Sequence, residues 1–235
     1  MSDIKMVHHH RDVQGGTARA AVFGISDGLV SNVGLILGVA AASTGAGNVI
    51  VAGVAGLLAG AVSMAAGEYV SVKAEAELVE RELAIERHSL AQDPEEEAAE
   101  LASIYVSRGL DPSQAKDLAD AVMEDPEVAL EVHAREELGV NPESVGDPVG
   151  AASSSFVAFS IGAILPLLPW FFAEGRAAIL ASVLIGLVAA AVVGATLAYF
   201  TERSMLRTAI RQTFIAAVAC SVTWLIGSAL GATVI

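Results

Sequence analysis

The chain has 235 residues, of which 54% are hydrophobic, and yet it carries a formal net charge of −14. Ordinary soluble domains rarely combine these two properties. The negative charge and the apolar residues lie in different parts of this chain. Residues 73–147 hold 21 acidic and 6 basic residues, whereas the rest of the chain holds 6 acidic and 7 basic residues. This composition argues against a single soluble domain, and we expect no nucleic acid among the partners.

Outside the acidic block, the chain contains long apolar runs without charged residues, at 28–67, 148–173, 177–201 and 212–235. A helix that crosses a bilayer needs about 20 apolar residues. We therefore predict an all-α integral membrane protein with five transmembrane helices, at residues 19–42, 48–72, 148–172, 176–200 and 211–233. The first helix follows a polar stretch and is too long for the apolar part of a cleavable signal peptide, so we expect it to be retained.

The basic residues predict the orientation. Twelve of the thirteen Lys and Arg residues fall on one side of the predicted membrane, and only Arg176 falls on the other. By the positive-inside rule, the N-terminal tail (1–18) and the acidic insert (73–147) face the cytoplasm, and the C-terminus faces the opposite side. The membrane part, in contact with the lipid bilayer, is thus predicted at 19–72 and 148–235.

The acidic insert has the pattern of short helices. Several Asp-Pro or Asn-Pro pairs place a capping side chain before a proline that suits a first helical turn. These pairs are Asp93-Pro94, Asp111-Pro112, Asp125-Pro126, Asn141-Pro142 and, at the start of the third span, Asp147-Pro148. No helix breaker stands between Val72 and about Leu90, so we expect the second span to continue as a helix into the cytoplasm.

Asp27 lies about two turns into the first span, where burying a carboxylate costs several kcal/mol unless it is paired, hydrated or coordinating a cation. A functional role is therefore the default interpretation. The alternative is structural: Asp27 would cap a broken helix or bond a neighbouring helix, with Ser26, Ser31 or Asn32 taking part.

In the second span, Met64 and Glu68 follow Gly60 at intervals of four residues, so a thioether and a carboxylate share one helix face. Such a pair suits Fe²⁺ or Mn²⁺ better than Ca²⁺ or Mg²⁺, which prefer oxygen ligands alone. The alternatives are ordinary packing for Met64 and, for Glu68, a side chain that extends to the membrane surface.

Three pairs in the insert stand at helical spacing and offer oxygen and nitrogen donors to first-row divalent metals. They are Glu82 with Glu86, Glu97 with Glu100, and His133 with Glu137. Spacing alone equally fits a solvated acidic face. We leave His8, His9 and His10 without a role, and Cys220, the single cysteine, fits a packing residue within the last span.

Four runs of the sequence resemble the vacuolar iron transporter family, over nearly the whole chain. They are GISDGLVSNVGLILGVAAAS (24–43), AGLLAGAVSMAAGEYVSVKAEAE (55–77), HAREELGV (133–140) and SSSFVAFSIGAILPLLPW (153–170). The order of SDGL, SMAAGEY and a proline-bearing third span makes the resemblance specific. The GEY form is similar to bacterial members, which favours the cell membrane as the host.

The resemblance implies a homodimer of five-helix subunits that exports cytosolic Fe²⁺ in exchange for protons. From the donor chemistry we also expect Mn²⁺ as a substrate, and we expect no permanently bound cofactor. It implies a pathway through Asp27 and Met64. It also implies that the insert collects metal ions through carboxylates, which here are Glu86, Glu97, Glu100 and Glu137.

The chain departs from the plant form of the family at presumed ligands. Gly56 stands where the plant form has a glutamate, and Glu68 stands at a glycine position and is a candidate replacement. Ser89 replaces another glutamate of the insert. His133 and Ala134 replace a methionine pair, so His133 is a candidate nitrogen ligand.

We therefore predict a transporter of divalent transition metal ions rather than an enzyme. The alternative is a membrane-anchored acidic protein that buffers metal or recruits a partner without transport, although it would leave Asp27 and Met64 unexplained. An intramembrane protease is disfavoured because the spans hold no second aspartate, no histidine and no H-E-x-x-H motif.

Overall fold

The computed structural model describes residues 16–42, 45–142 and 146–234. Within these ranges the regular structure is helical and no strand occurs. The chain divides into two compact units, one of residues 15–70 and 148–235 and one that includes residues 71–147, and each is described by itself. The histidine run at 8–10 lies outside the described residues.

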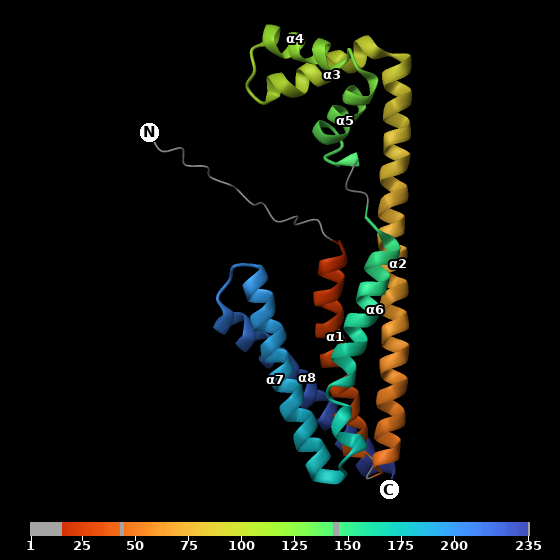
Figure 1. The fold of residues 1–235 in the computed structure, drawn as a ribbon, viewed down its shortest axis with the longest axis vertical. Helices are drawn as coiled ribbons and strands as arrows, with labels where there is room; N and C mark the ends of the chain where they lie inside the picture. Colours follow the sequence, from red (N-terminus) through yellow and green to blue (C-terminus); the bar gives the residue numbers. More distant parts are fainter. Residues whose placement is uncertain (1–15, 43–44, 143–145, 235) are drawn as a thin grey trace. The chain divides into compact units, whose positions relative to one another are not determined.

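The first unit contains α1 (Gly16–Ala42), the apolar part of α2 (Ala46–Gln92), α6 (Pro148–Ile164), α7 (Gly175–Phe200) and α8 (Met205–Val234) (Figure 1). Four of these helices, α1, α2, α7 and α8, are long and apolar enough to cross a membrane by length and composition. This unit is therefore a helical membrane domain.

The helix α6 is shorter than the predicted span at 148–172, because it ends at Ile164 after 17 residues. Pro166 lacks a backbone N–H and its ring clashes with the preceding turn, which ends an α-helix. The chain then forms a short 3₁₀ helix, Leu168–Phe171. Trp170 Nε1 donates to Ser182 Oγ of α7 at 2.9 Å, and this hydroxyl donates to the Pro166 carbonyl oxygen at 2.7 Å, which holds the broken segment in place.

Glycines allow α1 to pack closely against α6 and α8. A Cβ atom added to Gly28 would overlap the carbonyl oxygen of Phe159, and one added to Gly162 would overlap that of Ile25. On α8, a Cβ atom at Gly227 would overlap the carbonyl oxygen of Gly38. These are backbone-to-backbone contacts, which small residues permit between membrane helices. They fix α1 within the bundle.

The second unit contains the charged part of α2, followed by α3 (Pro94–Ser107), α4 (Pro112–Val122) and α5 (Pro126–Glu136) (Figure 1). Each of the three short helices begins at a proline that follows an aspartate, as the sequence predicted. The Asp111 side chain accepts from Ser113 N–H at 2.9 Å and Asp125 accepts from Glu127 N–H at 3.0 Å, whereas Asp93 makes no such bond.

The predicted extension of the second span is confirmed as helix, because α2 runs for 47 residues without a break. Its apolar part ends near Gly67, and charged side chains recur along it from Glu68 onward. A segment this rich in charge does not lie in hydrocarbon. The helix predicted after Asn141-Pro142 enters residues 143–145, which lie outside the described residues.

Candidate functional site

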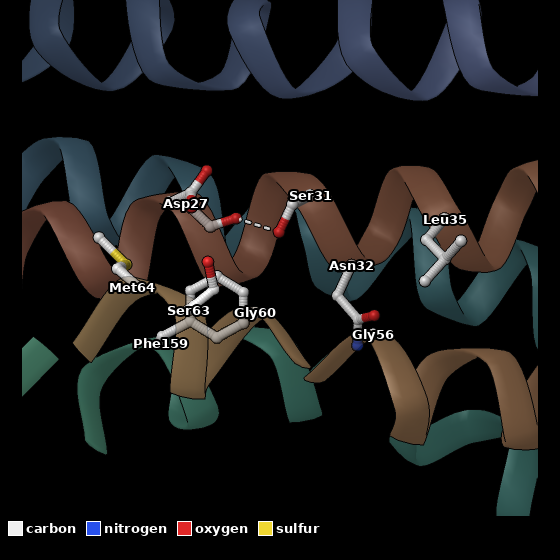
Figure 2. A pocket seen from close by; sticks show the side chains of 9 residues that line it. All are labelled: Asp27, Ser31, Asn32, Leu35, Gly56, Gly60, Ser63, Met64 and Phe159. Carbon is white, nitrogen blue, oxygen red and sulfur yellow. Dashed lines mark hydrogen bonds between the residues drawn. The ribbon is translucent and has the colours of Figure 1, made fainter. Parts of the chain in front are cut away.

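A pocket of about 330 Å³ lies in the membrane domain among α1, α2 and α6, and we call it the membrane pocket (Figure 2). Its lining residues are Asp27, Ser31, Asn32, Leu35, Gly56, Gly60, Ser63, Met64 and Phe159. The pocket brings the carboxylate of Asp27 and the thioether of Met64, which are 37 positions apart in the sequence, to one cavity.

The glycines of α2 allow side chains of the neighbouring segments to pack closely against this helix. A Cβ atom at Gly60 would overlap the ring of Phe159, and one at Gly56 would overlap the end of the Leu35 side chain. At Gly53 it would lie 2.6 Å from Leu167 Cδ1. Side chains of α1, α6 and the turn after α6 therefore fill the places where α2 has none, which brings the helices together around the pocket.

The structural alternative for Asp27 requires contacts with its polar neighbours. However, the Ser31 hydroxyl donates at 2.6 Å to the backbone oxygen of Asp27, not to its carboxylate. Gln212 of α8 donates to Ser26, and Asn32 Nδ2 donates to the Ala163 carbonyl oxygen at 2.7 Å. The helix α1 is unbroken at Asp27, and within the described residues its carboxylate has neither a hydrogen bond nor an ion pair.

Glu68 lies one turn after Met64 and does not line the membrane pocket. Its carboxylate is 15% exposed and lies 3.8 Å from the guanidinium of Arg19, which is 71% exposed. This ion pair was not anticipated from the sequence. Of the three residues predicted to line a pathway, the structure thus groups Asp27 with Met64 and pairs Glu68 with an arginine.

A second group of candidate ligands lies in the insert, and we call it the insert cluster: Glu86 of α2, Glu97 of α3, His133 of α5 and Glu137 at the end of α5. One ligand atom from each lies within 4.8 Å of the others. His133 Nδ1 lies 2.9 Å from Glu86 Oε1, and 3.7 Å from both Glu97 Oε2 and Glu137 Oε2. Three carboxylates and one imidazole thus surround a point that would suit a cation.

The insert cluster is buried at its centre, since His133 is fully buried and Glu86 is only 6% exposed. Burial, together with the charges of Glu137, Glu97 and Glu100, raises the pKa of Glu86 to about 7. Burial also lowers the pKa of His133, against the opposing effect of Glu137 and Glu100, and thus favours the neutral imidazole. For both residues burial is the largest cause of the pKa shift.

Buried polar atoms in this cluster lack hydrogen-bond partners among the described residues. They are Glu86 Oε1, His133 Nδ1 and His133 Nε2, since the 2.9 Å approach of Nδ1 to Oε1 does not have hydrogen-bond geometry. Buried polar groups are rarely left without partners unless an ion or water completes the site. The arrangement therefore has the chemistry of a metal site.

Two residues predicted for the insert lie apart from this cluster. Glu100 is exposed and contributes no atom to the close group, although its charge acts on Glu86. Glu82 pairs with Arg81 at 2.6 Å.

Sequence reasoning also gave no binding role to Asn32 or Ser63, which line the membrane pocket. An asparagine within an apolar run is a signal that would have singled out Asn32.

Comparison with known proteins gives consistent matches. Residues 18–228 match the VIT family. Vacuolar iron transporter 1 of Eucalyptus grandis is 32% identical over 92% of this chain and 88% of its own length, and that of Arabidopsis thaliana is 33% identical over 91% and 87%. The vacuolar iron transporter of Acanthamoeba castellanii is 38% identical over 88% of this chain and 76% of its own length.

Proposed function

Since this chain belongs to the VIT family, we propose that it carries a divalent transition metal ion, Fe²⁺ and also Mn²⁺, out of the cytoplasm in exchange for protons. The observation that carries the proposal is the membrane pocket, where a carboxylate without a bonding partner among the described residues meets a thioether. An intramembrane carboxylate of this kind is costly and marks an ion pathway by default.

The donor chemistry favours a first-row transition metal. In the membrane pocket, the Asp27 carboxylate supplies charge, Met64 supplies a soft sulfur, and the hydroxyls of Ser31 and Ser63 supply further oxygens. Magnesium and calcium prefer sites made of oxygen alone. The combination therefore supports iron or manganese over the alkaline-earth cations.

The insert cluster is proposed to collect the ion from the cytoplasm. Its three carboxylates offset the charge of a divalent cation, and the neutral imidazole of His133 adds a nitrogen donor that first-row metals accept. Glu100, whose charge already acts on Glu86, adds to the negative potential around the site without contributing a close ligand atom.

Exchange with protons follows from competition for the same atoms. A carboxylate that binds metal must be deprotonated, so metal binding releases protons and protonation releases metal. An ion that leaves Asp27 toward an acidic compartment would thus be replaced by a proton. The proposed cycle requires that flux depend on a pH gradient.

The proposed topology completes the five spans with α6 and the segment through Phe171. The 17 residues of α6 alone reach about 25 Å, short of the roughly 30 Å hydrocarbon thickness, and the segment after Ile164 adds the rest. The insert would face the cytoplasm and the C-terminus the other side, as the basic residues indicate. A homodimer would cover the exposed mouth of the membrane pocket, and the cell membrane is the proposed host.

Flux in proteoliposomes tests the proposal. With the insert facing outward and a pH gradient, uptake of Fe²⁺ or Mn²⁺ by the wild type is expected, and Asp27→Asn should reduce it at least tenfold. Glu174→Gln is the matched control, since Glu174 is exposed before α7 and its side chain makes no cap bond. Wild-type activity in Asp27→Asn would remove this carboxylate from the pathway.

The second candidate function is a membrane-anchored metal buffer, which the insert cluster alone would support. Both candidates bind metal, but only a transporter moves it. Binding of metal to the full-length protein without flux under any gradient would favour the buffer.

A further inference from the structure

One polar atom in the wall of the membrane pocket has no explained role. Asn32 is 2% exposed, and its Nδ2 donates to the carbonyl oxygen of Ala163 on α6 at 2.7 Å. Its Oδ1 is buried and has no hydrogen-bond partner among the described residues. Leaving a buried oxygen without a partner is unfavourable, so such an atom in a native structure calls for a function.

The orientation of the amide is determined by its contacts. If the amide were turned over, Oδ1 would face the Ala163 carbonyl oxygen, and two acceptors would oppose each other. The oxygen therefore points toward α2, where a Cβ atom at Gly56 would lie 3.0 Å from it. Figure 2 shows the amide extending from α1 to the space beside Gly56.

We propose that Asn32 Oδ1 is a ligand of the transported cation, at a second position in the membrane pocket beyond the Asp27 and Met64 position. This inference rests on the proposed function. Asn32 lies five residues after Asp27, or about 7.5 Å along the axis of α1. Metal–oxygen bonds are about 2 to 2.6 Å long, so an ion held by Asp27 and one held by Asn32 occupy separate positions.

The chemistry of the two positions differs in a way that suits onward movement. Asp27 binds a cation by charge, whereas a neutral amide oxygen binds it only by its dipole and therefore more weakly. Conduction requires sites that are strong enough to admit an ion and weak enough to release it. With the N-terminus of α1 in the cytoplasm, Asn32 lies on the exit side of Asp27.

Leu35 and Gly56 control access to this oxygen. A Cβ atom at Gly56 would overlap Leu35 Cδ2, which shows that the end of the Leu35 side chain lies over Gly56, next to the amide. Leu35 is 38% exposed, so this end can rotate without disturbing the core. Any side chain at position 56 would occupy the approach to Oδ1.

The experiment measures Fe²⁺ uptake in proteoliposomes, with turnover and KM expressed per folded transporter. Gly56→Ala adds a methyl group beside Oδ1 and leaves the Asn32–Ala163 hydrogen bond in place. Gly67→Ala on the same helix is the matched control, because no atom of the described residues lies within 4 Å of its added Cβ. We expect at least a tenfold loss of turnover for Gly56→Ala and wild-type turnover for Gly67→Ala.

The variant Asn32→Asp distinguishes two roles for Asn32, that of a cation ligand and that of a residue that only joins two helices. A carboxylate at this position would hold the cation more tightly, so KM for Fe²⁺ should fall severalfold and turnover should fall with it. A purely structural role would reduce the amount of folded protein but leave KM and turnover per folded molecule unchanged.

Unchanged KM and turnover in Asn32→Asp would overturn the assignment, and this variant decides if Gly56→Ala does not fold. Absence of uptake by the wild type would instead refute the proposed function itself.

Discussion

Removing the charge of Glu86 should make the insert more stable than the wild type in the absence of metal. In the presence of metal it should make the insert less stable than the wild type. Burial and three neighbouring carboxylates raise the pKa of Glu86 from 4.5 to about 7. At about 1.4 kcal/mol per pKa unit, this rise corresponds to about 3 kcal/mol. Some screening by solvent is expected, so the free energy gained by Glu86→Gln lies between about 1 and 3 kcal/mol.

The sign of this effect depends on pH. Below pH 4.5 Glu86 is protonated in both the folded and the unfolded insert, so folding buries no charge at this position. As pH rises from 4.5 to about 7, the unfolded state ionises first and stability is lost, and above about pH 7 the loss is complete. Without metal, Glu86→Gln should therefore raise the stability of the insert at pH 8 and have little effect on it at pH 4.

Hydrogen exchange of the α5 amides in the full-length protein measures this local stability. With a chelator at pH 8, protection in Glu86→Gln should exceed that of the wild type about fivefold to about a hundredfold, and comparison at equal pH cancels the intrinsic exchange rate. Added Mn²⁺ should reverse the order, because the variant lacks a ligand. Glu82→Gln, one turn earlier and paired with Arg81, is the control. Equal protection in both variants at pH 8 would refute the reasoning.

Three further predictions concern single side chains. His133→Ala should lower the affinity of the full-length protein for Mn²⁺ about tenfold or more in calorimetry at pH 7, because it removes the buried nitrogen donor, whereas Arg135→Ala, an exposed neighbour, should not. Arg19→Gln should change KM for uptake less than about fivefold, since its ion pair with Glu68 is largely exposed on the arginine side and such pairs contribute about 1 kcal/mol at most; a larger change would give Arg19 a role in metal entry. Gly28→Ala should lower the melting temperature in detergent by several degrees through overlap with the Phe159 carbonyl oxygen. Gly47→Ala, whose added Cβ meets no atom within 4 Å in the described part of the chain, should leave it unchanged.

The sequence was sufficient for features that depend on local physics. Aspartate before proline predicted where α3, α4 and α5 begin, because capping and a fixed φ act within one helical turn. The absence of a breaker predicted the length of α2. The prediction of one continuous helix at 148–172 was wrong, because it followed the apolar run past Pro166. This proline ends α6 at Ile164.

Features that depend on tertiary contacts could not be predicted from the spacing of residues in the sequence. Glu86, Glu97 and His133 come from three different helices, and periodicity within one helix does not predict which faces meet. The pairs predicted from spacing included Glu82 and Glu100, which lie outside the close group. The unpaired buried oxygen of Asn32 likewise depends on a tertiary contact, because its amide nitrogen donates to the carbonyl oxygen of Ala163 on another helix.

The glycines of the membrane domain differ in what they touch, and this makes the two walls of the membrane pocket mechanically unequal. Gly28 and Gly227 bring α1 against the backbones of α6 and α8, where main chain meets main chain and no side chain lies between them to yield. Gly56 of α2 instead receives the end of the half-exposed Leu35 side chain, which can turn aside, and Gly60 receives the ring of the buried Phe159 rather than a backbone. The carboxylate of Asp27 thus belongs to a rigid wall and Met64 to a compliant one. A sideways shift of α2 would consequently displace side chains, whereas a shift of α1 would press main chain against main chain.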